Sequence, residues 1–512
     1  MILKTEFPSI PQVYAGKTVF ITGGNGFLGK VLLEKLLRCC PDIKEIIVLL
    51  NQAYETATFL KKKEALLESS VFDRLKTEFP EALTKVKFVA GDVTTENLGL
   101  VENFQKIRSE VSFVFHCAAT VRFEEPPRTL LKINVSGVYH VAQLCLKMKK
   151  LEALVHVSTA YSFCHHPLIT EAMNCEKIPI DVMVNFNSMS DERLEHICNS
   201  YRKNRPSNYQ YSKALGETLL LKGFSGRIPI IIIRPGIITA AAKEPFPGWI
   251  DNYNGPNGFV ALSVKGILKS LFVKRGICAD WVPVDLVANT LITAAYFLIV
   301  KKSPTLSLSK DFNKLNTINS NVTVVNCVCP DTHQIHWTEV VKICKPLLHK
   351  YPSEHLYSPP GGVVTSCKIV HGLCKFFLHY LPASVVDFFT LATKRQAKMV
   401  KSYKRIHGVM NHLQLYTTRK FSFTSQNLSI LIASQRPIDA EVFPIDQTKI
   451  DWNEYLENYV HGVRLYFLKE SDDTLPLARK KLFRLQILLA GAETSVGLLI
   501  LFLLMRYSKL ST

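Results

Sequence analysis

A glycine-rich turn near the N-terminus limits most strongly what this chain can fold into. The run from Lys17 to Thr22 predicts a short buried strand, and Lys30 to Arg38 predict a helix with one apolar face. The turn between them is rich in glycine, and Gly23, Gly26 and Gly29 are each three residues apart. Glycines at this spacing allow a tight turn, close approach of a pyrophosphate to the backbone, and close helix–strand packing. Since a second strand, Glu45 to Leu50, follows, the segment predicts a dinucleotide-binding strand–helix–strand unit.

Strand-like runs continue along the chain, with helical stretches between them. They lie at Val86 to Ala90, Phe113 to His116, Leu154 to Ser158 and Ile228 to Ile233. This alternation predicts an α/β fold with a doubly wound parallel sheet of the Rossmann type. It fades from about residue 300, where aromatic segments containing proline begin. We therefore expect the Rossmann domain at 14–300, a connecting region at 301–360, and a mostly helical domain at 361–470.

The residues expected to contact the cofactor follow the ends of the predicted strands. Besides its glycines, the turn contributes four of them: Thr22, Asn25, Phe27 and Leu28. Asp92 follows the third strand, where a carboxylate would hydrogen-bond the adenine; the alternative is an ordinary turn residue. Ala118 and Ala119 follow the fourth strand and are small enough for a cofactor to lie against the backbone.

A tyrosine and a lysine four residues apart are the catalytic candidates. Tyr209 and Lys213 lie in a segment that reads as a helix, so they share one face. A phenol has an ordinary pKa near 10, and a neighbouring ammonium is expected to make it a usable acid at neutral pH. Tyr211 is a rival, but it stands two residues before Lys213 and points to a different face. After a glycine-rich Rossmann turn, the pair indicates a reductase or dehydrogenase.

Three further polar residues are expected to assist the catalytic pair. Ser158 or Thr159, at the end of a predicted strand, would donate a hydroxyl hydrogen bond to the substrate carbonyl. Asn134 would hold a water molecule that relays protons to Lys213. Alternatively, Asn134 lies inside a helix, and its side chain hydrogen-bonds the neighbouring backbone.

Charge and cysteine content limit the partners and the compartment. Lys and Arg number 62 against 43 Asp and Glu, and the excess is spread along the chain. A dispersed excess favours anionic small molecules or an anionic membrane face over nucleic acid. The 13 cysteines are scattered and odd in number, so we expect reduced thiols and no metal site.

One segment near the C-terminus is a candidate transmembrane helix. Leu485 to Met505 is apolar over about the length that crosses a bilayer, although Gln486 and Glu493 interrupt it. Basic residues precede it more densely than they follow it, which predicts a cytosolic location for the preceding domains. A second apolar stretch, Phe376 to Ala392, contains Pro382 and Asp387, and there we expect a core or interfacial helix in preference to a span.

Together these residues resemble the extended short-chain dehydrogenases, and longer segments narrow the resemblance to the alcohol-forming fatty acyl-coenzyme A reductases. The segments are GNGFLGKVLLEKLLR from Gly24, FHCAATVRFEEP from Phe115, NYQYSKALGE from Asn208 and IRPGIITAAAKEPFPGWIDNYNGPNG from Ile233. IDWNEYLENYVHGVRLYFLKE, from Ile450, resembles the end of that family's male-sterility-type C-terminal domain. The resemblance covers about residues 14 to 470.

The resemblance implies two successive NADPH-dependent reductions of a long-chain acyl-coenzyme A, first to an aldehyde and then to a primary alcohol. It favours Thr159 over Ser158 as the hydroxyl donor. It also places Arg234, Pro235 and the loop from Glu244 to Gly258 at the cofactor and acyl-coenzyme A site. The alternative is a surface loop fixed by its prolines and packed by Trp249.

This chain departs from the family at the end of the second strand. The family usually has an Arg there for the 2′-phosphate of NADPH, whereas this chain has Asn51 and Gln52. Since no acidic residue replaces the Arg, NADPH is still permitted. Lys61, Lys62 and Lys63 either supply the missing charge or form the solvated start of a helix.

The resemblance leads us to expect a protein on the membrane of the endoplasmic reticulum or peroxisome, with one C-terminal span and a cytosolic catalytic domain. Its oligomeric state stays open. The rival interpretations are another extended short-chain dehydrogenase, acting on a sterol, an aldehyde or a sugar nucleotide, and a non-catalytic paralogue that binds cofactor or lipid.

Overall fold

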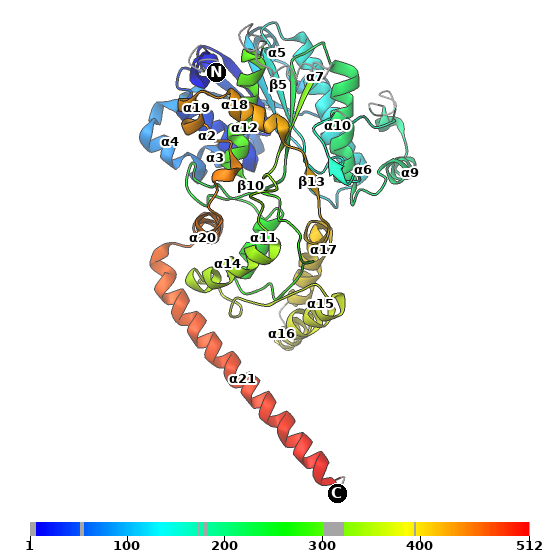
Figure 1. The fold of residues 1–512 in the computed structure, drawn as a ribbon, viewed down its shortest axis with the longest axis vertical. Helices are drawn as coiled ribbons and strands as arrows, with labels where there is room; N and C mark the ends of the chain where they lie inside the picture. Colours follow the sequence, from blue (N-terminus) through cyan, green and yellow to red (C-terminus); the bar gives the residue numbers. More distant parts are fainter. Residues whose placement is uncertain are drawn as a thin grey trace. The chain divides into compact units, whose positions relative to one another are not determined.

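The structure is a computed structural model that describes residues 7–51, 56–172, 174–178, 183, 185–301, 322–393 and 396–510. The chain divides into two compact units, each built from segments distant in sequence (Figure 1). Unit 1 comprises Met1–Trp249, Cys278–Ile335 and Arg419–Ile450. Unit 2 comprises Ile250–Ile277, His336–Thr418 and Asp451–Thr512. The boundaries expected at residues 300 and 360 stay a prediction, and residues 302–321 of the connecting region lie outside the described part.

The described part of unit 1 contains a seven-stranded parallel sheet in the order β11-β7-β5-β4-β1-β2-β3. The strands are β1 Thr18–Thr22, β2 Glu45–Asn51, β3 Val86–Gly91, β4 Val111–His116, β5 Ala153–Val157, β7 Ile230–Pro235 and β11 Val322–Cys327. The chain winds outward from β1 to β3 and then returns to the other side of β1 as β4. The predicted doubly wound Rossmann sheet is thereby confirmed, with its topological switch point between β1 and β4.

Helices cover both faces of this sheet (Figure 1). Those of unit 1 are α1 Ile10–Tyr14, α2 Phe27–Cys39, α3 Ala57–Leu67, α4 Asp73–Glu78, α5 Phe104–Glu110, α6 Pro127–Leu131, α7 Gly137–Lys147, α9 Asp191–Tyr201, α10 Asn208–Phe224, α12 Val284–Val300, α18 Gln426–Ser434 and α19 Pro437–Val442. α2 packs with α12, and α7 packs with α10. Because both faces are covered, the central strands are apolar throughout, and Ile230 to Ile233 are fully buried.

The sheet extends further along the chain than the sequence indicated. β11 pairs in parallel with β7, with Val322 opposite Ile230, although the strand–helix alternation was expected to fade from about residue 300. The signal was present in the β-branched run Val-Thr-Val-Val from Val322. It was missed because the prediction relied on the alternation of strands with helices, which fades before this segment.

Unit 2 is mostly helical in its described part, as expected for the C-terminal domain. Its helices are α11 Pro256–Val264, α14 Trp337–Lys350, α15 Lys368–Lys375, α16 Leu381–Ala392, α17 Met399–Thr418, α20 Trp452–Gly462 and α21 Leu475–Leu510. A short parallel pair, β9 Ser270–Phe272 and β12 Val363–Thr365, accompanies them. The candidate span Leu485 to Met505 lies within α21, where several side chains are outside the described part.

Among the described residues, one helix is long and apolar enough to cross a membrane, and it is not the segment expected to do so. It runs from Lys368 to Ala392, with a mean hydropathy of 1.3, and only 11% of its most apolar window is buried. α15, a π-helical turn at Phe376–Tyr380 and α16 form it in succession. A core position, one of the alternatives expected for Phe376 to Ala392, is therefore wrong.

Candidate active site

The glycine-rich turn brings the ends of β1 and β4 into backbone contact. Gly23 has φ +73°, and a Cβ atom there would lie 2.6 Å from the backbone nitrogen of Ala118. A Cβ atom on Gly29 would collide with the carbonyl oxygen of Gly23. Ala118 and Ala119 are half-buried, so this edge is lined by backbone and small side chains. Such a surface fits a dinucleotide lying across the switch point.

The start of α2 provides the polar end of this surface. Its N-cap is Gly26, which offers no side-chain hydrogen bond to the first turn. Asn25 and Gly26 are exposed, Leu28 is buried, and the ring of Phe27 stacks on Trp249 at 5.5 Å. The uncapped N–H groups and the helix dipole therefore suit a pyrophosphate.

A buried histidine holds the two strand ends together. The Nδ1 atom of His116 lies 2.7 Å from the hydroxyl oxygen of Thr22, which also accepts a hydrogen bond from the Ala118 N–H at 3.4 Å. Burial lowers the pKa of His116 to about 3, so its ring is neutral at physiological pH. Sequence alone indicates no role for His116, because only the pairing of β1 with β4 brings it to Thr22.

The two residues expected at the adenosine end lie at the ends of β2 and β3. Asp92 follows β3, and its carboxylate accepts the N–H of Thr94 at 2.8 Å, as an ordinary turn residue does. Asn51 is exposed at the end of β2, and its carbonyl oxygen accepts a hydrogen bond from the Lys62 ammonium at 2.9 Å. Gln52 lies outside the described residues.

Helix α10 carries the two catalytic candidates, Tyr209 and Lys213. The hydroxyl of Ser207 caps its first turn by accepting the N–H of Tyr209. Lys213 is buried one turn later, and its ammonium donates to the carbonyl oxygen of Val157 at 2.6 Å. Burial lowers the pKa of Lys213 to about 8, against the opposing influence of Glu217. The lysine is thus fixed to the end of β5.

The two tyrosines of this helix lie in different surroundings. Tyr209 is half-buried, and its ring meets Phe123 edge-on at 5.2 Å. Tyr211 is 1% exposed and packs in the core beneath the guanidinium of Arg205. Burial raises the pKa of Tyr209, so the lowering expected beside Lys213 is not found and the phenol stays protonated at neutral pH.

Asn134 joins this helix to the turn after β4. It lies in a π-helical turn, Lys132–Ser136, a feature often found at functional sites. Its amide donates to the hydroxyl of Ser212 at 3.0 Å and to the Thr120 carbonyl at 3.2 Å, and its oxygen accepts the Thr120 N–H at 3.0 Å. The backbone that it bonds is therefore distant in sequence.

The two candidate hydroxyls after β5 have different partners. Ser158 hydrogen-bonds Ser162 at 3.0 Å and also the carboxylate of Glu217. Thr159 accepts the N–H of Tyr161 at 3.3 Å. Since Ser158 is committed to a buried carboxylate, the placement favours Thr159 as the hydroxyl that meets a substrate.

Arg234 is placed inside the protein. Its guanidinium pairs with Glu217 at 2.5 Å, and both side chains are fully buried. It also donates to the carbonyl oxygen of Thr170 at 2.9 Å, while the carbonyl of the buried Pro235 accepts the N–H of Ala160. In this arrangement Arg234 and Pro235 support the turn after β5, and a direct cofactor contact by either stays a prediction.

The segment before Trp249 is tied to α2. The carboxylate of Asp285 accepts three successive N–H groups, from Ala242, Lys243 and Glu244. Glu244 pairs with Lys35 and Arg38 of α2, and Trp249 is fully buried. The segment is therefore packed against α2, and its place at the acyl-coenzyme A site stays a prediction.

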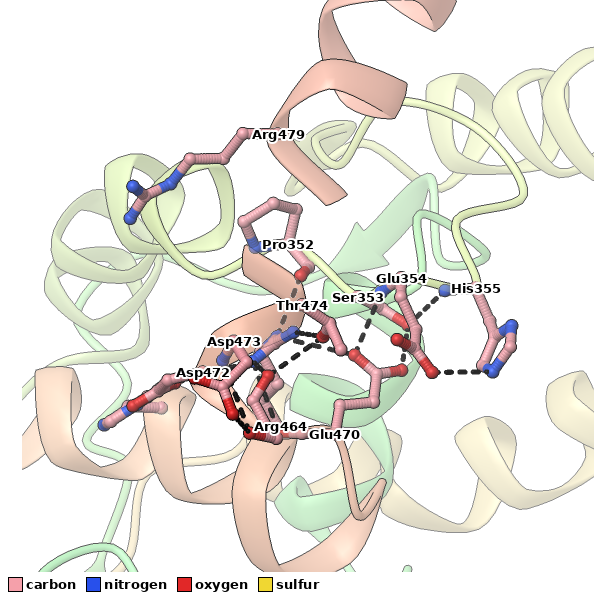
Figure 2. Close-up of polar contacts among 12 residues, drawn as sticks. Pro352, Ser353, Glu354, His355, Arg464, Glu470, Asp472, Asp473, Thr474 and Arg479 are labelled. Carbon is pink, nitrogen blue, oxygen red and sulfur yellow. Dashed lines mark hydrogen bonds and ion pairs between the residues drawn. The ribbon is translucent and has the colours of Figure 1, made fainter. Parts of the chain in front are cut away.

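Unit 2 contains one arrangement of potential metal ligands within the described residues. Ligand atoms of Glu354, His355 and Glu470 lie within 4.8 Å of one another. However, Glu470 already pairs with the buried guanidinium of Arg464 at 3.4 Å and accepts the Ser353 hydroxyl and the Glu354 N–H (Figure 2). Arg464 also donates to the carbonyl of Pro352 and the hydroxyl of Thr474. The cluster is thus a hydrogen-bonded support before α21.

Comparison with known proteins agrees with this geometry. Residues 21–291 match an NAD-binding family that is described as male sterility protein. Residues 378–470 match a second family, Sterile, which has the same description. A reductase domain of a nonribosomal peptide synthetase from Mycobacterium tuberculosis shares the fold, with a TM-score of 0.56 and 17% identity over 90% of this chain and 94% of that one. The fold and the family match thus define a Rossmann protein of an NAD-binding family, with a nicotinamide dinucleotide as its cofactor.

Full-length relatives identify the family. The chain is 35% identical to fatty acyl-CoA reductase 1 of Mus musculus over 96% of its own length and 92% of the relative's. It is 30% identical to fatty acyl-CoA reductase 2 of Bos taurus over 93% and 90% of the two chains. The protein belongs to the fatty acyl-CoA reductase family.

We predict that Glu217→Ala destabilises the protein by about 3–5 kcal/mol, because it leaves the Arg234 charge buried without its partner. The measurement is urea unfolding of the purified protein in detergent. Glu78→Ala is the matched control, since Glu78 pairs with Arg74 at the surface and its loss costs about 1 kcal/mol or less. Equal losses in the two variants would contradict the structural role of the buried pair.

Proposed function

We propose that this protein reduces long-chain acyl-coenzyme A to a primary alcohol through an aldehyde, with NADPH as the reductant. One observation supports this most directly. Lys213 is buried and bonded to the end of β5, four residues after Tyr209, in the unit whose β1 and β4 ends meet at Gly23 and Ala118. Similarity to named fatty acyl-CoA reductases over nearly the whole chain supplies the substrate class.

The reaction needs a hydride and a proton at each of two steps, and the bound reduced nicotinamide supplies the hydride. Tyr209 holds the proton, because burial raises the pKa of its phenol. Its hydroxyl, with that of Thr159, binds the carbonyl oxygen and polarises the carbon. In the first reduction the carbon–sulfur bond breaks and coenzyme A leaves as the thiol. In the second, the aldehyde oxygen takes a proton from Tyr209 and becomes the alcohol.

Lys213 and Asn134 act behind Tyr209. With its pKa near 8, the Lys213 ammonium is still mostly charged at neutral pH, and it stabilises negative charge that develops on the phenol oxygen. Asn134 holds Ser212 and therefore the middle of the helix turn that carries both residues. A relay of protons through water at Asn134 stays part of the proposal.

We further propose that Lys62 compensates for the missing Arg in the recognition of NADPH. Its ammonium reaches the end of β2, the position at which this fold binds the adenosine ribose. Lys61 and Lys63 are exposed on the same helix, and Lys63 lies over the ring of Phe88. These contacts favour Lys62 among the three lysines as the partner of a 2′-phosphate.

For the location of the protein, we propose a single C-terminal span within α21 and a cytosolic catalytic domain, on the endoplasmic reticulum or the peroxisome. The basic cluster before Leu485 supports this orientation. A cytosolic site would also have direct access to NADPH and acyl-coenzyme A.

Tyr209→Phe is expected to abolish alcohol formation and leave NADPH binding nearly unchanged, because it removes a proton donor only. The measurement is product analysis of membranes given NADPH and a panel of acyl-coenzyme A thioesters. Tyr211→Phe is the control, since that ring lies in the core and its loss should be mild. Turnover of Tyr209→Phe within a few-fold of the unaltered protein would disprove the assignment, and a lack of alcohol from the unaltered protein would disprove the function.

Lys62→Ala is expected to weaken NADPH binding by a factor of roughly ten to a hundred, the value of one charged hydrogen bond, and to leave NADH binding unchanged. Asn51→Arg should strengthen NADPH binding more than NADH binding. Both effects are measured by equilibrium titration of the two nucleotides without acyl substrate. Lys61→Ala is the matched control. If Lys62→Ala weakens both nucleotides equally, or if the unaltered protein prefers NADH, this view of the pocket is wrong.

Deletion of Leu485 to Thr512 is expected to remove attachment that resists alkaline carbonate, because it removes the proposed span. In intact vesicles, added protease should digest the Rossmann domain of the unaltered protein and leave a short C-terminal fragment. A fully protected reductase domain would reverse the topology. Complete extraction of the unaltered protein by carbonate would show that no segment spans.

A further inference from the structure

We propose that the helix from Lys368 to Ala392 is a membrane-binding surface that lies in the plane of the cytosolic leaflet, separate from the C-terminal span. The proposal adds a second attachment to the membrane protein inferred above, and it rests on that inference. The polarity of this helix is the reverse of the usual one: its buried positions are partly polar, whereas its outward face is apolar.

The buried positions of the helix follow a narrow stripe. His379, Ala383 and Asp387 stand four residues apart and are at most 9% exposed. Large apolar side chains that are 40–74% exposed cover the outward face: Ile369, Val370, Leu373, Phe376, Phe377, Leu378, Leu381, Val385, Val386, Phe388, Phe389 and Leu391. A contiguous patch of this kind is rare on a protein surrounded by water and marks a binding surface.

The buried stripe ties the helix to the rest of unit 2. His379 accepts the N–H of Lys269 at 2.9 Å through one ring nitrogen and meets His407 of α17 at 3.0 Å through the other. The carboxylate of Asp387 accepts the N–H groups of Lys398, Met399 and Val400, which start α17. The middle and the end of the helix are therefore held against folded, polar structure.

These bonds favour an in-plane helix over a span. A crossing helix would bring Asp387 and the start of α17, with the exposed Lys398 and Lys401, toward the hydrocarbon. Moving charged groups there costs several kcal/mol each. If the helix lies at the interface, its phenylalanines enter the acyl region while the polar stripe and α17 stay on the water side.

The charge around the helix identifies its binding partner as an anionic bilayer. From Val363 to Thr418 the sequence contains eight Lys and Arg residues and one acidic residue, Asp387, which is buried. Lys368, Lys398, Lys401, Lys404 and Arg405 are exposed. This combination of apolar face and basic surroundings matches a leaflet with anionic headgroups. A second copy of the chain fits less well, because it would place two basic clusters opposite each other.

The test places a photoreactive benzoylphenylalanine at Phe389, which is 63% exposed, in the full-length protein. The protein is reconstituted in vesicles whose outer leaflet carries deuterated phosphatidylserine. After irradiation, mass spectrometry should find adducts with the deuterated lipid. We expect about tenfold or more adduct than from a probe at Phe79, an exposed phenylalanine of unit 1, because burial of one phenyl ring in hydrocarbon favours contact by that factor.

A second probe at Ile369 tests the in-plane orientation, because it should label the same leaflet as Phe389. Labelling of opposite leaflets would show a span and overturn the proposal. Adducts with another copy of the chain, or no adduct from a protein that still binds NADPH, would also overturn it. Labelling needs no acyl substrate and should persist in Tyr209→Phe. Failure of the membrane-helix proposal is therefore distinguishable from failure of the proposed reaction.

Discussion

The contact between two backbone turns, at Gly23 and Ala118, is the constraint on which the rest of the site depends. Only a residue without a side chain fits at Gly23, because a Cβ atom there would lie 2.6 Å from the Ala118 nitrogen. The contact draws the end of β1 against the end of β4, and the buried pair Thr22 and His116 fixes it in place. Because only backbone and small side chains line both turns, a dinucleotide can lie across the switch point of the sheet, close to the uncapped start of α2.

The residues that we propose to carry the chemistry lie on one face of α10. Tyr209, Lys213 and Glu217 stand four residues apart, so they follow one another along the helix from a half-buried end to the core. Glu217 is buried with Arg234, and its charge counteracts the lowering of the Lys213 pKa that burial causes. The lysine therefore remains mostly protonated at neutral pH although it is surrounded by protein. Glu217 thus helps to keep a charge on the lysine that we propose to stabilise the phenol oxygen of Tyr209.

Local pattern was sufficient for the sheet and for placing Tyr209 and Lys213 on one helix, because strands, helices and i, i+4 spacing are recorded in neighbouring residues. It was insufficient where partners are distant in sequence. His116 has a role only beside Thr22, and the burial of Arg234 depends on Glu217 of a different element. β11 escaped prediction because it lies beyond the alternation of strands and helices that identified the other strands. Its place beside β7 is decided by the sheet, which leaves an edge where a β-branched run can pair.

The segment from Lys368 to Ala392 shows why hydropathy alone misjudges a helix. Its polar residues suggested a core or interfacial helix, since His379 and Asp387 interrupt the apolar run. In the structure these residues do face the protein, but they bond to backbone and to another histidine, and the apolar residues are left outside. Water is a poor surrounding for such a face, whereas lipid tails are a good one. An acyl-coenzyme A has the same division, with a charged head in water and a chain that prefers hydrocarbon. If this helix binds the leaflet as proposed, it holds the protein at the boundary where both parts of such a substrate lie.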